Sequence, residues 1–260
     1  MSYKYINYVK KNKIAYITIN RPERMNALHA PANEEMTDAF NDFNTDPNSW
    51  IAIITGKGPK SFSAGNDLKY TNEQNHSGNN IQYNSSRFGG LDGIWECWKP
   101  IIGAINGYAL GGGLELAMSC DILIAAEHAE LGLPEGKVGL VPGSGVHRLP
   151  RHIPIKIAMG MILTGRRINA EEALNLGLVN EVVPIEELMN TAEKWAHEIL
   201  QIAPLSARAS KQMILSGLDS PLNIAMTRKY SEWEKAQVSQ DIIEGPKAFS
   251  EKRKPNWTAS

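Results

Sequence analysis

The sequence has 260 residues, of which 42% are apolar, and it balances 27 Lys and Arg against 28 Asp and Glu for a net charge of −1 at pH 7. This composition predicts a soluble globular chain that buries about three quarters of its unfolded surface in one large core. The balanced charge excludes nucleic acid or an anionic membrane as the main partner, because both attract clustered basic charge. Cys97 and Cys120 are too few for a disulfide framework or a metal motif, so we expect reduced thiols in a cytoplasmic protein.

The first half of the chain predicts alternating strands and helices. Residues 13–20 alternate with the two-residue period of a strand, and residues 31–44 carry apolar side chains at helical spacing before a short strand over 51–55. This order of strand, helix and strand predicts an α/β core. Two more apolar runs, 101–105 and 122–126, are short enough for buried strands, and the glycines and the carboxylate between them exclude a membrane span.

The middle and the end of the chain differ from this pattern. Residues 70–90 are polar and rich in Asn and Ser, which predicts a mobile surface loop over a site. From residue 185 onward, apolar spacing predicts a long helix that ends at Pro204, followed by helices over 206–218 and 221–239. The last third is therefore expected to be mostly helical.

A glycine run, Gly111 to Gly113, leads directly into the apolar segment 114–118. Glycine lets a ligand approach the backbone closely, and the first N–H groups of a helix have no intrahelical acceptor. Such N–H groups can stabilise a carbonyl oxygen that gains negative charge, as in an oxyanion hole. A tight turn with close packing of strand and helix is the alternative interpretation.

Two glutamates are candidates for acid and base chemistry. Glu115 lies between two leucines, with no Lys or Arg from 101 through 124, so its burial would raise the carboxyl pKa toward neutrality. Glu135 lies in an apolar loop. Either residue alone could face solvent, but together they offer the two carboxylates that addition of water to a double bond requires. The sequence has no HExxH, CxxC pair or GxSxG motif, and its six histidines are scattered, so no metal site is expected.

The segment 61–69 follows the second predicted strand and consists mainly of small residues. Loops at the carboxyl ends of strands bind ligands in α/β sheets, which makes this segment a candidate binding loop. The alternative is an ordinary turn into a helix with Asp67 as its cap.

Several longer segments together resemble the crotonase family, the enoyl-CoA hydratase/isomerase superfamily, in order and spacing. They are INRPERMNAL (19–28), FSAGNDLK (62–69), KPIIGAINGYALGGGLELAMSCDILIA (99–125), LPEGKVGLVPG (133–143), LTGRRINAEEALNLGLVNEVV (163–183) and EGPKAFSEKRKPNW (244–257). Within the family, LTGRRINAEEAL and the C-terminal segment look most similar to carnitinyl-CoA (crotonobetainyl-CoA) dehydratases.

The resemblance implies an α/β fold, a crotonase-like spiral of repeated ββα units over residues 1–200. It implies a helical C-terminal region over 201–260 that forms a homotrimer or a dimer of trimers. The implied ligand is an acyl-CoA thioester, so no cofactor is expected beyond the coenzyme A of the substrate. The backbone N–H groups of Asn66 and Gly112 would form the oxyanion hole, and Glu115 and Glu135 would be catalytic. The implied residues for binding of CoA and substrate are Arg24, Ala64, Asp67, Leu68, Lys69, Tyr108, Gly111 and Gly143.

The sequence departs from the family pattern at three places. Asn66 stands where alanine is common, the loop 143–146 is one residue shorter than usual, and residues 70–90 match no signature. We expect an enoyl-CoA hydratase that adds water to a 2-enoyl-CoA to give a 3-hydroxyacyl-CoA. The alternatives are a carnitinyl-CoA dehydratase, a Δ3,Δ2-enoyl-CoA isomerase, or a non-catalytic RNA-binding member, against which the near-neutral charge argues. The scattered cations expected to meet the CoA phosphates are Arg21, Arg24, Lys69 and Lys252.

Overall fold

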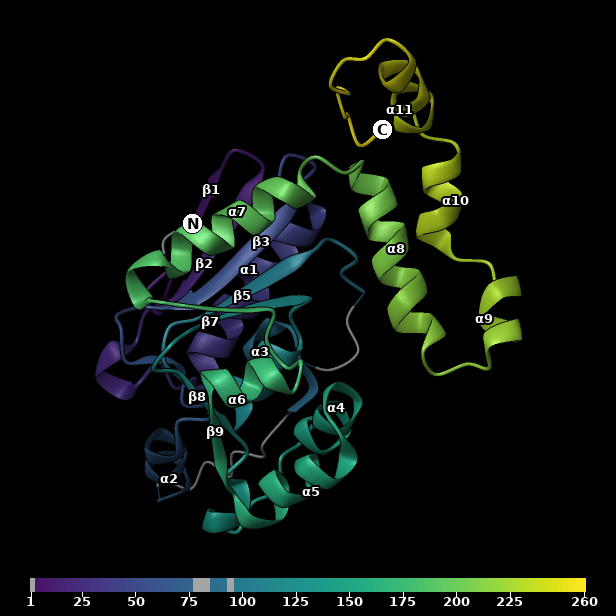
Figure 1. Ribbon diagram of the computed structural model, residues 1–260. Coiled ribbons are helices and arrows are strands. Elements are labelled where there is room, and N and C mark those ends of the chain that lie inside the picture. The colour runs from purple at the N-terminus through teal and green to yellow at the C-terminus, as the bar shows by residue number, and fades with distance from the viewer. Residues whose placement is uncertain (1–2, 77–84, 93–95) are drawn as a thin grey trace.

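The protein, described by a computed structural model over residues 3–76, 85–92 and 96–260, has a sheet-based core and a helical arm beyond it (Figure 1). The strands of the larger sheet are β1 (Ile6–Lys11), β2 (Ile14–Ile19), β3 (Ile51–Gly56), β5 (Ile101–Ile105), β7 (Ile122–Ala126) and β10 (Glu181–Val183). Those of the smaller sheet are β4 (Ser61–Ser63), β6 (Tyr108–Leu110), β8 (Glu130–Gly132) and β9 (Arg167–Asn169). The sheets have the orders β1-β2-β3-β5-β7-β10 and β4-β6-β8-β9.

Helices cover the sheets and form the arm. The α-helices of the core are α1 (Ala30–Thr45), α2 (Leu68–His76), α3 (Gly112–Met118), α4 (Gly145–His152), α5 (Ile155–Thr164), α6 (Ala170–Asn175) and α7 (Leu188–Ile199). Those of the arm are α8 (Pro204–Gly217), α9 (Leu222–Thr227), α10 (Ser231–Gln237) and α11 (Asp241–Ser250). Short 3-10 helices are η1 (Pro22–Arg24), η2 (Ser85–Gly90), η3 (Glu135–Val138) and η4 (Ile185–Glu187). Within the described ranges, no helix is long and apolar enough to cross a membrane.

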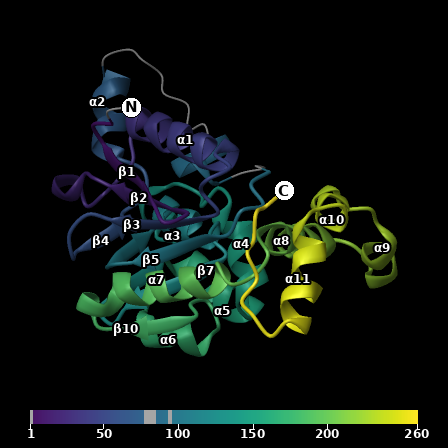
Figure 2. The same ribbon diagram turned by 90° about the horizontal axis from the view of Figure 1, so that it is seen from above.

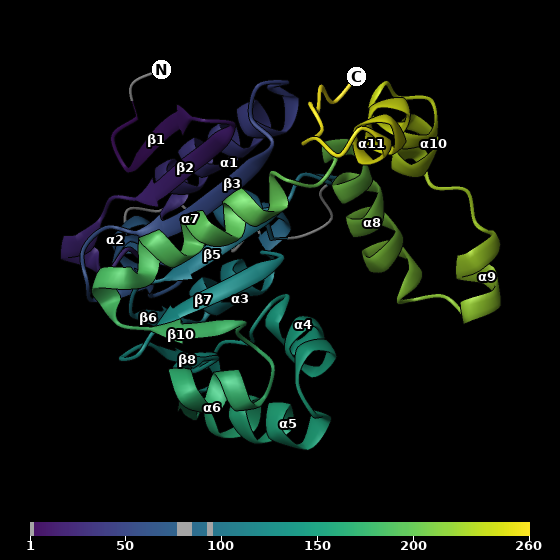
Figure 3. The same ribbon diagram turned by 45° about the horizontal axis from the view of Figure 1, so that its top comes forward.

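Strands β3, β5 and β7 of the larger sheet are buried on both faces, and their side chains divide between two apolar clusters. On β3, Ile51 and Ile53 pack with α7, whereas Ala52 and Ile54 face the cluster that holds α1 and α3. Figure 3 shows α7 lying along this sheet, where it contacts β3, β5 and β7. Strands β2, β3, β5, β7 and β10 run parallel, and such doubly covered parallel strands read as continuous apolar runs. The predicted α/β fold and the predicted unit of strand, helix and strand are confirmed as β2, α1 and β3.

Two predictions for the N-terminal half were incomplete or wrong. Strand β1 was not predicted, because it is an edge strand with mostly exposed side chains and pairs only with β2 among the described strands. Residues 70–90 were predicted as a loop, but α2 covers 68–76 and η2 covers 85–90. The Asp67 carboxylate caps the start of α2 by accepting the Tyr70 N–H at 3.1 Å, which confirms the alternative interpretation of Asp67 as a cap. Residues 77–84 of the predicted loop lie outside the described residues.

The predicted C-terminal helices are present with two corrections. Helix α7 ends at Ile199 and α8 begins at Pro204, whose fixed backbone suits the first turn of a helix. The helix predicted over 221–239 divides into α9 and α10. Its break is at Tyr230, which is extended and buried, with its hydroxyl donating to the Ala225 carbonyl at 2.9 Å.

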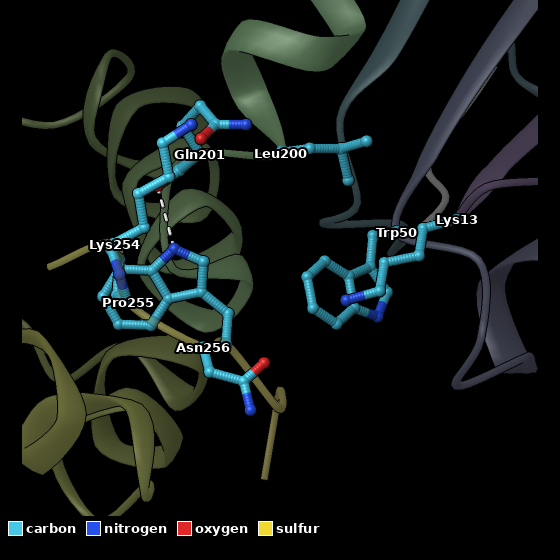
Figure 4. Close-up of a pocket in the computed structure, with 8 residues that line it drawn as sticks. Lys13, Trp50, Leu200, Gln201, Lys254, Pro255 and Asn256 are labelled. Atoms are coloured by element: carbon cyan, nitrogen blue, oxygen red, sulfur yellow. Dashed lines mark hydrogen bonds between the residues drawn. The ribbon is translucent and has the colours of Figure 1, made fainter.

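The arm of α8 to α11 stands to one side of the core in two views (Figures 1 and 2). Its C-terminal tail returns to the core around a cavity of about 210 Å³. Figure 4 shows Lys13 and Trp50 on the core side of this cavity, facing Lys254 and Asn256 of the tail. The Trp257 indole N–H anchors the tail by donating to the Gln201 carbonyl at 2.8 Å. This cavity contains none of the candidate site residues named above.

Candidate active site

The two predicted binding segments meet where the smaller sheet borders α3. Gly65 has a φ of +85°, and a Cβ added to it would lie 2.9 Å from the Gly112 nitrogen. Gly111, with φ 57° and ψ −128°, holds a conformation that side chains rarely adopt, and its N–H donates to the Gly132 carbonyl at 2.9 Å. The segments after β4 and β6 therefore pass each other backbone to backbone. Only glycine allows an approach this close.

Two N–H groups at this crossing are available to a ligand. Asn66 forms an isolated parallel β-bridge with Leu28, but its own N–H takes no part in it. The two hydrogen bonds of the bridge run from the Leu28 N–H to the Gly65 carbonyl and from the Asp67 N–H to the Leu28 carbonyl. Gly112 is the first residue of α3, so its N–H has no intrahelical acceptor. Among the described residues, neither N–H donates to a backbone acceptor outside the regular elements. Two unused donors on adjacent segments match the requirement for an oxyanion hole.

Glu115 lies on α3 and is only 7% exposed, which excludes the solvent-facing alternative. Its Oε1 accepts the Gly145 N–H at 2.7 Å. Burial raises the pKa of the Glu115 carboxyl, and the N–H groups of Gly145 and Ser144 oppose this effect by stabilising the charged form. The first turn of α4 therefore fixes the position of the Glu115 carboxyl and partly offsets the effect of burial on its pKa.

Glu135 opens η3 and lies beside the same glycines. Its Oε1 is 3.0 Å from the position of a Cβ added to Gly111. Its Oε2 is buried and has no hydrogen-bond partner among the described residues. Burial, with a smaller contribution from the negative charge of Glu115, raises the pKa of Glu135 to about 7. The two predicted glutamates are thus brought together, with Glu115 held by backbone donors and Glu135 left free to gain and lose a proton near neutral pH.

Of the side chains predicted to contact CoA, some already bind other residues of the protein and others are exposed to solvent. The Arg21 guanidinium is buried and donates to Asp67 at 2.8 Å and to the Ala27 carbonyl, so the expectation that Arg21 meets a phosphate is wrong. The Asp67 carboxylate pairs with Arg21 and also accepts the Tyr70 N–H. Asp67 therefore supports the structure of the segment 61–69. Arg24 and Lys69 are both exposed.

The remaining predicted positions fall in different surroundings. Ala64 is half-buried and its N–H donates to Met25, whereas Leu68 is exposed at the start of α2. The Tyr108 ring lies under the Arg167 guanidinium at 5.5 Å. Gly143 is exposed in the loop before α4, and Lys252 is exposed at the end of the arm.

Sequence reasoning missed the groups that surround Glu115. These are the N–H groups of Ser144 and Gly145, and an ion pair between Asp92 and Arg148 with a separation of 3.2 Å between Nε and Oδ1. Asp92 lies in an apolar stretch, the same signal that identified Glu115, but its cationic partner is distant in sequence. In the described part of the chain, no three His, Cys, Asp or Glu side chains are grouped to hold a metal ion.

Known proteins resemble this chain over almost its whole length. Residues 9–260 match the family model described as enoyl-CoA hydratase/isomerase. A carnitinyl-CoA dehydratase of Salmonella enteritidis PT4 is 41% identical over 257 residues, 97% of each chain, and one of Citrobacter koseri is 40% identical with the same coverage. Among solved structures, an enoyl-CoA hydratase of Mycobacterium tuberculosis H37Rv superposes with a TM-score of 0.90 at 35% identity, covering 98% of this chain and 99% of that one.

Proposed function

Because the chain belongs to the enoyl-CoA hydratase/isomerase family, we propose that it reversibly adds water to the double bond of a 2-enoyl-CoA thioester to give a 3-hydroxyacyl-CoA. The observation that carries this proposal is the pair of carboxylates, buried Glu115 and half-buried Glu135, in unlike environments beside two N–H groups that have no backbone acceptor among the described residues. Water addition needs one group that takes a proton and one that supplies a proton, and unequal environments assign these roles.

In the proposed mechanism, the N–H groups of Asn66 and Gly112 polarise the thioester carbonyl. The Glu115 carboxylate holds the water and takes its proton as the oxygen attacks the β-carbon. Protonated Glu135 gives a proton to the α-carbon, so that atoms and charge balance. Each positioned acid or base contributes about 10² to 10⁴-fold in rate, and each oxyanion donor about 10² to 10³-fold. CoA binding is proposed at the exposed Arg24 and Lys69, on the surface beside the Ala64 to Asp67 segment.

A second candidate is dehydration of carnitinyl-CoA to crotonobetainyl-CoA, favoured by the names of the curated relatives at 40% to 41% identity. The chemistry is the same reaction in the reverse direction on a substrate with a cationic acyl end. The isomerase alternative needs only one carboxylate, and the second glutamate, half-buried Glu135, favours the hydratase.

A panel of substrates tests the proposed function. Crotonyl-CoA, longer 2-enoyl-CoAs, crotonobetainyl-CoA and 3-hydroxypropionyl-CoA are assayed side by side with a 3-enoyl-CoA. We expect interconversion of 2-enoyl-CoA and 3-hydroxyacyl-CoA, and preference for crotonobetainyl-CoA would select the second candidate. Conversion of the 3-enoyl-CoA to the 2-enoyl-CoA without any hydroxyacyl product would contradict the hydratase.

We also propose that residues 201–260 are an oligomerisation region that forms a homotrimer or a dimer of trimers. The arm exposes large apolar side chains, among them Leu222, Met226, Val238 and Phe249, the last of which is 87% exposed. The accessible surface of the single chain is 13768 Å², above the roughly 11,000 Å² typical of a folded monomer of this mass. Exposed apolar surface of this extent indicates a protein interface.

Two buried free cysteines support a cytoplasmic location.

Light scattering of the purified protein tests this assembly. We expect a mass of three or six times 28.7 kDa, and a reduced mass for the Leu222→Glu/Met226→Glu variant. The matched control is Val9→Glu, at an exposed apolar residue on β1, which should keep the wild-type mass. A wild-type mass of 28.7 kDa, or an equal effect of the control, would contradict the proposed role of the arm.

A further inference from the structure

Asp92 and Arg148 form an ion pair behind Glu115. The Asp92 side chain is 1% exposed, and its Oδ1 accepts the Arg148 Nε–H at 3.2 Å. The Asp92 backbone N–H donates to the Phe88 carbonyl at 3.1 Å, which ties the carboxylate to the end of η2. A carboxylate this deeply buried is stable only with a cationic or hydrogen-bonding partner.

The pair connects two parts of the active site. Arg148 lies three residues after Gly145, whose N–H holds Glu115, and the Arg148 N–H closes the first turn of α4 on the Ser144 carbonyl at 2.9 Å. On the other side, the Phe88 ring lies against Gly112, where it would be 2.7 Å from an added Cβ. The segment that carries Asp92 therefore contacts Gly112 of the proposed oxyanion hole. Through Arg148 it also anchors α4, whose first turn binds the Glu115 carboxyl.

The charges that face Glu115 come from three neighbouring elements. They are Asp92 after η2, Arg148 on α4, and Glu135 on η3. Besides burial, which has the largest effect, Asp92 raises the pKa of Glu115 and Arg148 lowers it. The two charges have opposite effects on the pKa of Glu115. The ion pair that links α4 to Asp92 therefore adds little net charge beside Glu115.

We propose that Asp92 and Arg148 are positioning residues for the reaction, holding the first turn of α4 on the Glu115 carboxylate while cancelling each other's charge there. This inference rests on the proposed function, in which Glu115 acts as the ionised base. Neither residue touches the reacting atoms. Their effect is on the position and the ionisation of Glu115.

The charge balance gives a test that a merely structural role would not pass. Arg148→Gln leaves the Asp92 charge uncompensated, so the acid limb of the kcat/KM profile should move to higher pH. Asp92→Asn leaves the Arg148 charge uncompensated, so the same limb should move to lower pH. We expect each shift to be about 0.5 pH unit or more, since charges near a carboxyl commonly change its pKa by this amount. The Asp92→Asn/Arg148→Gln variant should return the limb toward its wild-type position with a lower kcat.

Hydrogen exchange of the Gly145 amide supplies a readout that does not depend on turnover. We expect faster exchange over 144–149 in the Arg148→Gln and Asp92→Asn/Arg148→Gln variants, and recovery of protection in Arg148→Lys. Unchanged exchange, or single-variant limbs that move in the same direction or not at all, would overturn the proposal. If the wild-type protein hydrates no enoyl-CoA, the proposed function fails, and hydrogen exchange alone then decides whether the pair holds Glu115.

Discussion

Replacing Glu135 with Gln is expected to lower the rate of crotonyl-CoA hydration by at least about a hundredfold while leaving binding of the CoA thioester intact. Gln keeps the shape of the side chain but cannot give a proton to the α-carbon. The pKa of about 7, caused first by burial, lets Glu135 be protonated at neutral pH, so wild-type hydration should also decline as the pH rises through about 7. The measurement is kcat and KM for crotonyl-CoA against pH, with a dissociation constant for a non-reactive acyl-CoA.

Loss of activity in this variant can be separated from unfolding. Because the folded pKa of Glu135 is raised, its contribution to stability is complete below its ordinary pKa of 4.5 and is lost as the pH rises through about 7. Gln is neutral at every pH, so the variant should unfold no more readily than the wild type at alkaline pH. Glu130→Gln, at an exposed ion pair on β8, is the matched control and should keep full activity. Near-normal turnover in Glu135→Gln would remove Glu135 from the mechanism.

The second large effect is expected at Gly113. A Cβ added to Gly113 would lie 2.0 Å from the Ser63 carbonyl oxygen, a separation at which the backbone must move. Ser63 leads into Gly65 and Asn66, so Gly113→Ala would push α3 away from β4 and separate the Gly112 N–H from the Asn66 N–H. Misplacement of reacting groups by about 1 Å costs about 10²-fold, so we expect at least that loss of kcat together with a lower unfolding temperature.

Gly136 provides a control for the added methyl group. Apart from its two chain neighbours, no described residue has an atom within 4 Å of a Cβ added to Gly136, which directly follows Glu135 in η3. Gly136→Ala should therefore keep wild-type activity and stability. If Gly113→Ala retained most of the wild-type turnover, the spacing between β4 and α3 would not set the oxyanion geometry.

The fold was predictable from sequence where one periodic pattern dominates. The strands around 51–55 and 101–105 are buried on both faces and read as continuous apolar runs, and α1 shows helical spacing. The prediction failed where a contact outside the periodic pattern decides the structure. An example is the buried Tyr230, which separates α9 from α10. The Asp67 cap of α2 was anticipated only as an alternative, and the loop predicted over 70–90 missed the helix that follows it.

The same division applies to the candidate site. Glu115 was identifiable because a carboxylate within an apolar helix is unusual, and its neighbouring glycines indicated close backbone approach. Its immediate partners were not identifiable, since Gly145 is 30 residues away in sequence and the pair of Asp92 and Arg148 is 56 residues apart. Arg21 shows the converse, because a cation that seemed free for phosphate is used to hold Asp67. Local patterns thus indicate reactive residues, whereas tertiary pairing determines their environment.

The most direct test of the central claim is hydration of a 2-enoyl-CoA in water enriched in oxygen-18, with the product analysed by mass spectrometry. The proposed mechanism predicts a 3-hydroxyacyl-CoA that carries one solvent oxygen on its β-carbon, formed rapidly by the wild type and at least about a hundredfold more slowly by Glu135→Gln. The proposed mechanism would be contradicted if no substrate of the panel gained solvent oxygen in its acyl group. It would also be contradicted if both proteins incorporated this oxygen equally fast.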